Sequence, residues 1–417
     1  MKTVVEQAFR APRWAPAAGL VLLLALFSYS LRRAADHSGG SQAIMLAESP
    51  TTLVVDSHTG RAFVGTSGPY GGGHVLVVDT GTGMLLRAVS LTSAPVAMAM
   101  DERAGHVVVA SGGAAVVLLD ATTGNVLRTT IVHHSPFALA VDEQTRRAFV
   151  LSEGVGDPQH SSMSVNVLDT RSGVLLHTLA VGRLPGQLAL DRPAGRVLLT
   201  SPDAGTTSTL YVLDARSGTL LHTRRLKGYI TGMAVDERSG CAYLISADTP
   251  RLRVLDARSG AVLRALPLDA RPMAVAVDRT TGHVFIQNAT GTRVLDARTG
   301  RLRRLRGPGQ AAPTRLLVAD GPRVVVASWG NGTLSLMDRL RGGRCVVPVA
   351  GDLVALATDQ RTARMVVLTG ADMVPAGDVA WAAWARGLLA WPPRLRPPTR
   401  SRRFVAGAVN ILDTSCL

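Results

Sequence analysis

Side chains that could bind a ligand gather in irregular, glycine- and proline-rich stretches of the 417-residue chain and in the connections between its repeats. The candidates are Tyr70, His74, His133, His134, Asp157, His160, Arg183, Lys227, Tyr229, Asp248, Arg251, Arg271, Trp329 and Asn331. Variable loops on a rigid scaffold are where binding sites usually lie. We therefore expect a ligand-binding surface there, with functionless drift of loop sequence as the alternative.

The sequence contains no familiar catalytic or cofactor motif. There is no Gly-x-Ser-x-Gly elbow, phosphate-binding loop, haem motif or Asp-x-Asp-x-Asp calcium loop. His133 and His134 could ligate a metal ion, but no further ligand can be assigned to them. We predict no catalytic residue, no metal site and no cofactor.

A short unit that recurs along the chain must position these loops. Its clearest copy is Val254 to Gly260, which reads Val-Leu-Asp-Ala-Arg-Ser-Gly. An apolar run that ends in Asp-x-x-Ser/Thr-Gly is typical of a strand entering a tight turn. The aspartate accepts hydrogen bonds from amides that follow it, and the glycine supplies the positive φ that closes the turn.

A second aspartate turn precedes each copy of this unit. The first-turn aspartates are Asp56, Asp101, Asp142, Asp191, Asp236, Asp278, Asp320 and Asp359. The second-turn aspartates are Asp79, Asp120, Asp169, Asp214, Asp256, Asp296, Asp338 and Asp413. First-turn aspartates follow one another at steps of 39 to 49 residues. A period of about 40 to 45 residues with four strands per unit is typical of a β-propeller.

The repeat resembles the YVTN-type β-propeller family of bacterial and archaeal cell-surface and periplasmic proteins. The matching pattern is Ala-Val-Asp-x-x-Thr/Ser-Gly-x-Val-Phe/Tyr-Val, followed by Val-x-Val-Leu-Asp-x-x-Thr/Ser-Gly. It covers about residues 43–417 apart from one interruption. The resemblance implies an extracytoplasmic propeller that acts as a binding or interaction scaffold.

We expect an all-β propeller domain over residues 42–417, with eight four-stranded blades; seven blades are the alternative. The eighth unit runs from Leu353 to Gly370, resumes at Val405 and lacks an outermost strand. Residues 43–48 match the fourth strand of other units and are expected to complete it. This pairing would remove the open edge that a propeller must otherwise protect.

Strand direction predicts two different faces. Because strands alternate in direction within a blade, both aspartate turns should lie on one face, and the irregular loops and inter-blade connections on the other. We interpret the turn residues as structural. The repeat positions occupied by His106 and His283, and by His177 and His222, are interpreted as exposed polar positions.

The N-terminus contains an apolar stretch. Trp14 to Leu31 carry no charge and are flanked by Arg13 and by Arg32-Arg33. This length is near the lower limit for crossing a bilayer. Residues 1–41 are therefore expected to form a cytoplasmic tip, a transmembrane signal anchor and a linker, with the propeller outside the cytoplasmic membrane. Cleavage after Ser30, which would release a secreted propeller, is the alternative.

Residues 371–403 interrupt the last blade. The spacing of their apolar residues predicts a helix that is followed by a basic segment. Such a helix could lie in a membrane interface or pack on the propeller. The membrane-interface candidates are Trp381, Trp384, Leu388, Trp391, Arg394 and Arg396.

Composition leaves three functional hypotheses. The formal charge is +15, and lysine occurs only at Lys2 and Lys227, so the excess is arginine. The leading hypothesis is a non-catalytic binding scaffold for a protein or surface polymer. The second is a propeller enzyme, lactonase-like or a metal-dependent hydrolase, with its site at the mouth of the central channel. The third is polyanion or nucleic-acid binding through arginine, which the 4% aromatic content disfavours. Cys345 and Cys416 could form a disulfide in an oxidising compartment.

Overall fold

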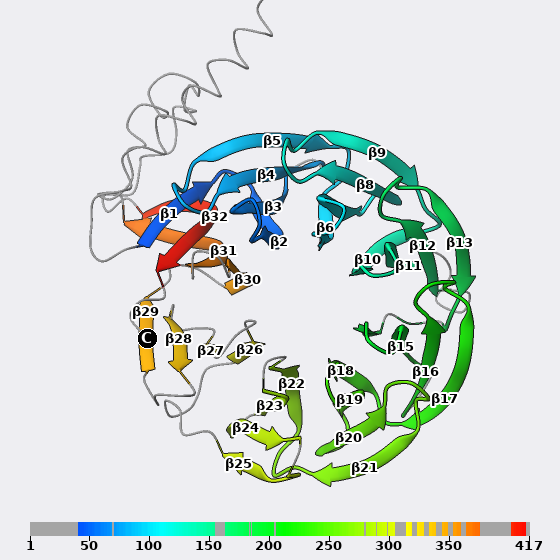
Figure 1. Ribbon diagram of the computed structural model, residues 1–417. Coiled ribbons are helices and arrows are strands. Elements are labelled where there is room, and N and C mark those ends of the chain that lie inside the picture. The colour runs from blue at the N-terminus through cyan, green and yellow to red at the C-terminus, as the bar shows by residue number, and fades with distance from the viewer. Residues whose placement is uncertain are drawn as a thin grey trace, which may run out of the picture.

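The computed structural model describes residues 41–413 apart from 69–70, 155–162, 183, 185, 204–205, 279–280, 289, 298, 305–313, 319–322, 329–332, 339–343, 349–352, 360–363 and 376–401. These described residues form strands and turns and contain no helix (Figure 1). Accordingly, none of them belongs to a helix with the length and apolar character needed to cross a membrane.

Every strand belongs to a four-stranded antiparallel sheet, and seven sheets each use four consecutive strands. We number these sheets 1 to 7 in chain order. Sheets 1 to 3 contain β2 (Ser49–Asp56), β3 (Arg61–Ser67), β4 (Gly73–Asp79) and β5 (Leu85–Leu91); β6 (Pro95–Asp101), β7 (His106–Ser111), β8 (Ala115–Asp120) and β9 (Val126–Ile131); and β10 (Ser135–Asp142), β11 (Arg147–Glu153), β12 (Met163–Asp169) and β13 (Leu175–Ala180).

Sheets 4 to 7 repeat this pattern. They contain β14 (Leu188–Asp191), β15 (Arg196–Pro202), β16 (Thr207–Asp214) and β17 (Leu220–Lys227); β18 (Ile230–Asp236), β19 (Cys241–Ser246), β20 (Arg251–Asp256) and β21 (Val262–Pro267); β22 (Pro272–Val277), β23 (His283–Asn288), β24 (Gly291–Asp296) and β25 (Leu302–Arg304); and β26 (Thr314–Val318), β27 (Arg323–Ser328), β28 (Thr333–Asp338) and β29 (Arg344–Pro348).

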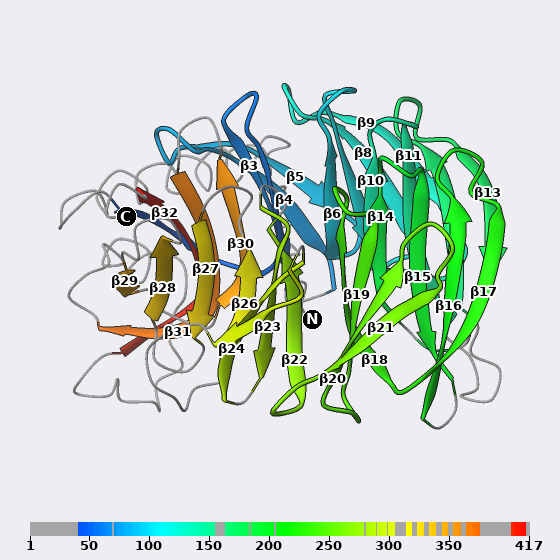
Figure 2. The same cartoon turned by 60° about the horizontal axis from the view of Figure 1, so that its bottom comes forward.

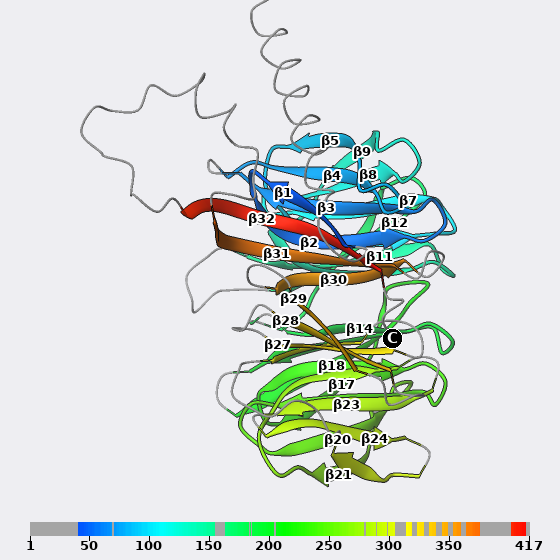
Figure 3. The ribbon, with the colours of Figure 1, turned by 90° about the vertical axis from the view of Figure 1, so that its left-hand side faces the viewer.

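One further sheet, which we call the terminal sheet, combines both ends of the described chain. Its strands are β1 (Ser41–Leu46), β30 (Leu353–Asp359), β31 (Arg364–Pro375) and β32 (Arg402–Asp413), in the order β1-β32-β31-β30. β1 runs antiparallel beside β32 and places Ile44 opposite Val409 (Figure 3). This is the pairing that the sequence analysis expects for residues 43–48.

β31 and β32 extend further than the sequence analysis expects. Their pairing continues from Asp372 opposite Val405 to Pro375 opposite Arg402. Residues 371–375 and 402–403, which the sequence predicts to belong to the interruption, instead prolong the hairpin, because the backbone ladder continues beyond the blade. The expected helix with Trp381, Trp384, Leu388 and Trp391 lies outside the described residues, as do Arg394 and Arg396.

The sheets are arranged around a central axis as in a β-propeller (Figure 1). In sheets 1 to 7 the first strand is innermost and the fourth outermost, and in the terminal sheet β30 is innermost and β1 outermost. Inner strands contact one another from β30 through β2, β6, β10, β14, β18 and β22 to β26. Figure 2 shows strands of sheets 3 and 4 running from one face of the ring to the other.

The core lies between neighbouring sheets. Middle strands such as β7 and β11 are buried on both sides, which explains their continuous rather than alternating apolar sequence. A fully buried aromatic occupies the third position of four second strands: Phe63, Phe149, Tyr243 and Phe285. Burial raises the pKa of the Tyr243 phenol to about 12.

Hairpin register separates the two faces. Arg61 lies opposite both Asp56 and Asp79, so both aspartate turns of sheet 1 lie at the same end of the sheet. We call this side of the ring the turn face. The links between second and third strands and between sheets meet at the other side, the loop face, where Gly112 N donates to Ala94 O at 3.0 Å.

Candidate functional site

The structure describes eight of the loop-face candidates and places them in three separate groups. The described candidates are His74, His133, His134, Lys227, Tyr229, Asp248, Arg251 and Arg271. Tyr70, Asp157, His160, Arg183, Trp329 and Asn331 lie outside the described residues.

The first group lies where the chain passes from the terminal sheet to sheet 1. Glu48, in the link between β1 and β2, accepts a hydrogen bond from Thr66 Oγ1 at 2.5 Å, and its Oε2 lies 2.9 Å from His74 Nδ1. The threonine hydroxyl thus points to the carboxylate and not to the imidazole, so this trio is not a nucleophile with its base. It joins the link after β1 to β3 and β4. Nothing in the sequence around Glu48 indicates this role, because its partners are 18 and 26 residues away.

The second group is the histidine pair before β10. The ring centroids of His133 and His134 are 6.3 Å apart and tilted by 56°. His134 has a φ of 67°, and its ring covers Gly154 so closely that a Cβ there would lie 3.0 Å from the imidazole. Both side chains are exposed. Within the described part of the chain, no group of three His, Cys, Asp or Glu side chains has the arrangement of a metal site.

The third group, which we call the Tyr229 cluster, lies on the loop face of sheets 4 to 6. Tyr229 N donates to Asp248 Oδ1 at 3.2 Å, and Ala247 N donates to Tyr229 O at 3.0 Å. Gly228 has a φ of 100°, and a Cβ at this position would lie 3.0 Å from Asp248 Oδ1. A glycine is therefore required for the loop to reach the carboxylate. The Tyr229 side chain stays 41% exposed.

Charged side chains occur at the same ends of sheets 4 to 6. Lys227, Arg251 and Arg271 are exposed, whereas Arg253 is half-buried and donates to Ser246 Oγ at 2.6 Å. Burial lowers the pKa of Arg253, and the charge of Arg251 adds to this effect, while the nearby Asp248 carboxylate opposes it. The cluster thus combines one exposed aromatic ring and three exposed cations with a carboxylate that is bonded to the backbone of Tyr229.

Hydrogen bonds also fix the carboxylate of Asp269, in the link before β22. Arg293 donates to its carboxylate, and Thr290 Oγ1 and Asn288 Nδ2 each donate at 2.9 Å. The hydrogen bond from Arg293 is the main reason that the pKa of Asp269 is lowered to about 2. Its negative charge is therefore present at any physiological pH.

Inner strands contain a feature that sequence analysis missed. The second or third residue of these strands is the extra residue of a β-bulge in six sheets, at Thr51, Val96, Phe137, Thr231, Met273 and Val354. A bulge turns a side chain away from the regular pleat. Val96 is 39% and Met273 54% exposed, so apolar side chains are accessible beside the axis at the loop face. The Pro-x-Ala sequence around several of these bulges could have indicated their positions.

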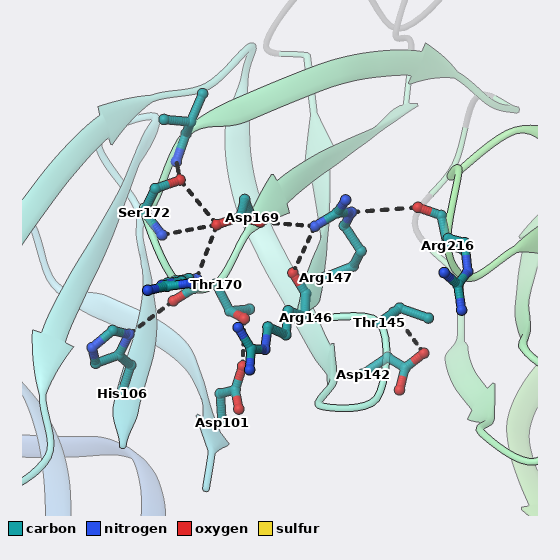
Figure 4. A network of polar contacts seen from close by, with 12 residues as sticks. Asp101, His106, Asp142, Thr145, Arg146, Arg147, Asp169, Thr170, Ser172 and Arg216 are labelled. Atoms are coloured by element: carbon teal, nitrogen blue, oxygen red, sulfur yellow. Dashed lines mark hydrogen bonds and ion pairs between the residues drawn. The ribbon is translucent and has the colours of Figure 1, made fainter. Parts of the chain in front are cut away.

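On the turn face, the structure corrects the interpretation of one repeat position. The first residue of the second strand was expected to be exposed, but His106 is half-buried and donates from Nδ1 to Thr170 O of the next sheet at 2.9 Å (Figure 4). Arg61 reaches Ala121 O at 3.2 Å in the same way. His283, expected to be exposed as well, is also half-buried. His106 and Arg61 thus join neighbouring sheets, because the next sheet approaches this end of the strand, whereas His283 Nδ1 is buried without a hydrogen-bond partner among the described residues.

His177 and His222, which share a repeat position in the outermost strand, differ in exposure. His177 is half-buried against the turn glycine Gly218 of the next sheet, whereas His222 is exposed as expected. The difference again depends on how closely the neighbouring sheet approaches.

Comparisons with known proteins identify the fold and no more. No protein-family model matches the chain, and no curated protein matches its sequence. Among solved structures, the computationally designed protein Ika8 is similar with a TM-score of 0.59 and 19% identity over 78% of this chain and 94% of that one. Sqt1 of Saccharomyces cerevisiae is similar with a TM-score of 0.61 and 12% identity over 88% of this chain and 96% of that one.

Proposed function

We propose that this protein is an eight-bladed, membrane-anchored extracytoplasmic β-propeller of the YVTN type. In this proposal it is a non-catalytic scaffold that binds a protein or surface polymer on its loop face. The pairing of β1 with β32 supports the blade count, because it supplies the terminal sheet with a fourth strand. The uncharged stretch from Trp14 to Leu31 supports the anchor.

The Tyr229 cluster is the observation that carries the binding role. Exposed tyrosine and arginine side chains on a rigid base are typical of energetically important contacts in protein interfaces. Their backbone is fixed by Asp248 and Gly228, so little loop entropy is lost on binding.

The inner strands favour a scaffold over an enzyme. β2, β6, β10, β14, β18 and β22 carry no charged residue before the aspartate that ends or follows each of them. A hydrolase site at the axis would need acidic or imidazole side chains to converge there. These six strands instead present small and apolar side chains.

Photo-crosslinking in membranes that contain the full-length chain tests this function. A photoreactive phenylalanine analogue replaces Tyr229 in one variant and Arg103, an exposed residue of the turn face, in the matched control. We expect a discrete non-lipid adduct from position 229 and none from position 103. Adding Arg251→Ala and Arg271→Ala should reduce the adduct by roughly tenfold, as interface arginines commonly do. The same adducts from both positions, or none from position 229, would refute loop-face binding.

A further inference from the structure

An exposed leucine recurs at one position in the outermost strand of sheets 1 to 5. Each of these leucines is the extra residue of a β-bulge: Val167 lies opposite His177 and Leu168 opposite Leu175, so Leu176 has no partner across the ladder. The bulge turns the side chain outward, next to the second aspartate turn. The five residues and their exposed fractions are Leu86 48%, Leu127 49%, Leu176 45%, Leu221 39% and Leu263 57%.

In sheets 3 to 5 an exposed arginine stands beside this leucine. Arg171, Arg216 and Arg258 each follow the second-turn aspartate by two residues. We call Leu176, Leu221, Leu263 and these three arginines the Leu/Arg corner.

The charge balance at the Leu/Arg corner is positive. Asp169 is paired with Arg147 at 2.8 Å, and Asp214 with Arg196 at 3.3 Å, so Arg171 and Arg216 are left in excess. In sheet 5, Arg258 lies close to Asp256, and the exposed Arg264 of the outer strand provides the excess charge. Each of the three positions thus combines an exposed apolar side chain with a net positive charge.

The N-terminal stretch reaches the fold on the same face. Ser41 lies opposite Leu412, next to the end of the terminal sheet where Arg364 lies opposite Asp413. That end belongs to the turn face, because Arg364 also lies opposite the first-turn Asp359. The far end of the β31–β32 hairpin, at Pro375 and Arg402, points to the loop face. Ser41, where the described chain begins, and the Pro375–Arg402 end of the hairpin therefore lie on opposite faces.

We infer that the Leu/Arg corner rests on an anionic lipid bilayer. Leucine side chains would enter the boundary between headgroups and acyl chains, and the guanidinium groups would bind lipid phosphates. The three leucines lie in the outermost strands of three successive sheets, and all six side chains are exposed, which suits contact with an extended surface. Sheets 3 to 5 lie across the ring from β1 (Figure 1), so the disc would lie with its turn face on the membrane. The inference rests on the folded sheets and does not require the proposed anchor.

The test uses the full chain in lipid nanodiscs that carry a photoactivatable phospholipid, with labelled peptides identified by mass spectrometry. In discs of phosphatidylcholine and phosphatidylglycerol, we expect labels on Leu176, Leu221 and Leu263. Labelling of these leucines should be lost in discs of phosphatidylcholine alone. Replacement of Arg171, Arg216 and Arg258 by Gln should reduce it by about tenfold or more, since each basic residue near an anionic surface contributes roughly a factor of five.

The matched control removes three positive charges from the opposite face, in Lys227→Gln/Arg251→Gln/Arg271→Gln, and should leave the labels unchanged. Equal loss in both variants, labels on the loop face, or crosslinks between two copies at these leucines would overturn the inference. Labelling of the Trp14–Leu31 peptide is read separately. Its absence alone contradicts the proposed anchor, whereas its presence without labelled leucines contradicts the Leu/Arg corner.

Discussion

At the residue scale, the buried first-turn aspartates need a hydroxyl donor, and the repeats supply one in two different ways. Asp56 and Asp142 accept from a threonine three residues later, Thr59 at 2.5 Å and Thr145 at 2.7 Å. Asp101 has Ala104 at that position and accepts from Thr170 of the next sheet instead (Figure 4). A hydroxyl from the same turn or a hydroxyl from the next sheet can therefore offset the desolvation of the buried carboxylate.

Asp191 has no hydroxyl donor at either of these two positions. Ala194 stands at the local position and Ala257 at the neighbouring one, and within the described residues Asp191 Oδ2 is buried with no hydrogen-bond partner. Burial raises the pKa of Asp191, and the charges of Glu237 and Asp256 add to this effect. An unpaired buried oxygen of this kind destabilises the fold.

We predict that Ala194→Thr increases the free energy of unfolding by about 1 kcal/mol, because the new hydroxyl can donate to Asp191 Oδ2. Urea denaturation measures this difference. Ala257→Thr should act in the same way from the next sheet, and the double variant should gain no more than the better single one. Thr145→Ala, which removes the equivalent hydroxyl from Asp142, is the opposite control and should be destabilising. Additive gains would show that the two threonines act at different sites.

The gain should also depend on pH. Because its pKa is raised, Asp191 binds its proton more tightly in the folded protein than in the unfolded chain. Its contribution to stability therefore falls as pH rises from the ordinary aspartate pKa of about 3.9 through the raised value. Threonine at position 194 stabilises the carboxylate, so the gain should be smaller at about pH 4 than at about pH 7. A gain that is constant with pH would contradict the role of Asp191.

At the element scale, β1 holds the first and last parts of the described chain together. Ile44 is 5% exposed and packs in a core cluster that includes Val64, Val366 and Val409, from β3, β31 and β32. The contribution of β1 is thus both a ladder of backbone hydrogen bonds and apolar burial between two sheets.

We predict that Ile44→Ala lowers the free energy of unfolding by about 2–4 kcal/mol, as expected for truncation of a buried side chain. Ile131→Ala is the matched control, because Ile131 is 71% exposed at the end of β9; its effect should stay within about 0.5 kcal/mol. Chemical denaturation compares the two variants directly. Similar small effects would mean that β1 contributes little to the stability of the ring.

At the scale of the whole molecule, the two proposals assign different tasks to the two faces. The turn face carries the Leu/Arg corner and receives the N-terminal stretch. The loop face carries the Tyr229 cluster and would point away from the membrane, toward a partner. This arrangement makes the orientation of the disc measurable.

Lysine chemistry can report this orientation, because Lys227 on the loop face and Lys2 are the only lysines in the chain. We predict that an amine-reactive reagent modifies Lys227 at the same rate in anionic nanodiscs and in detergent, since the loop face stays in water. Peptide mass spectrometry separates this signal from that of Lys2. Protection of Lys227 by the bilayer would show that the disc lies with the opposite face on the membrane.

The repeat, the aspartate turns and the presence of two dissimilar faces can be predicted from the amino-acid sequence alone. These features are local: Asp256 Oδ1 accepts from Ser259 N at 2.7 Å, and Gly260 takes a φ of 68°, all within five residues. The matching of β1 to the last unit was also readable, because a missing fourth strand and an unassigned strand are both visible in the repeat. The sequence identifies the loop-face candidates but does not show which of them lie close together.

The packing of neighbouring sheets, which the sequence does not reveal, sets which repeated polar residues join sheets and which are left without partners among the described residues. His106 looks ordinary in its own repeat, and the missing local hydroxyl at Ala194 leaves Asp191 without a donor only because Ala257 of the next sheet supplies none either. Both outcomes thus depend on the neighbouring sheet, more than 60 residues further on. The outward direction of Leu176 likewise depends on a one-residue slip in the ladder between β12 and β13. Register and the approach of one sheet to the next are set by packing across the whole ring, and no short stretch of sequence contains that information.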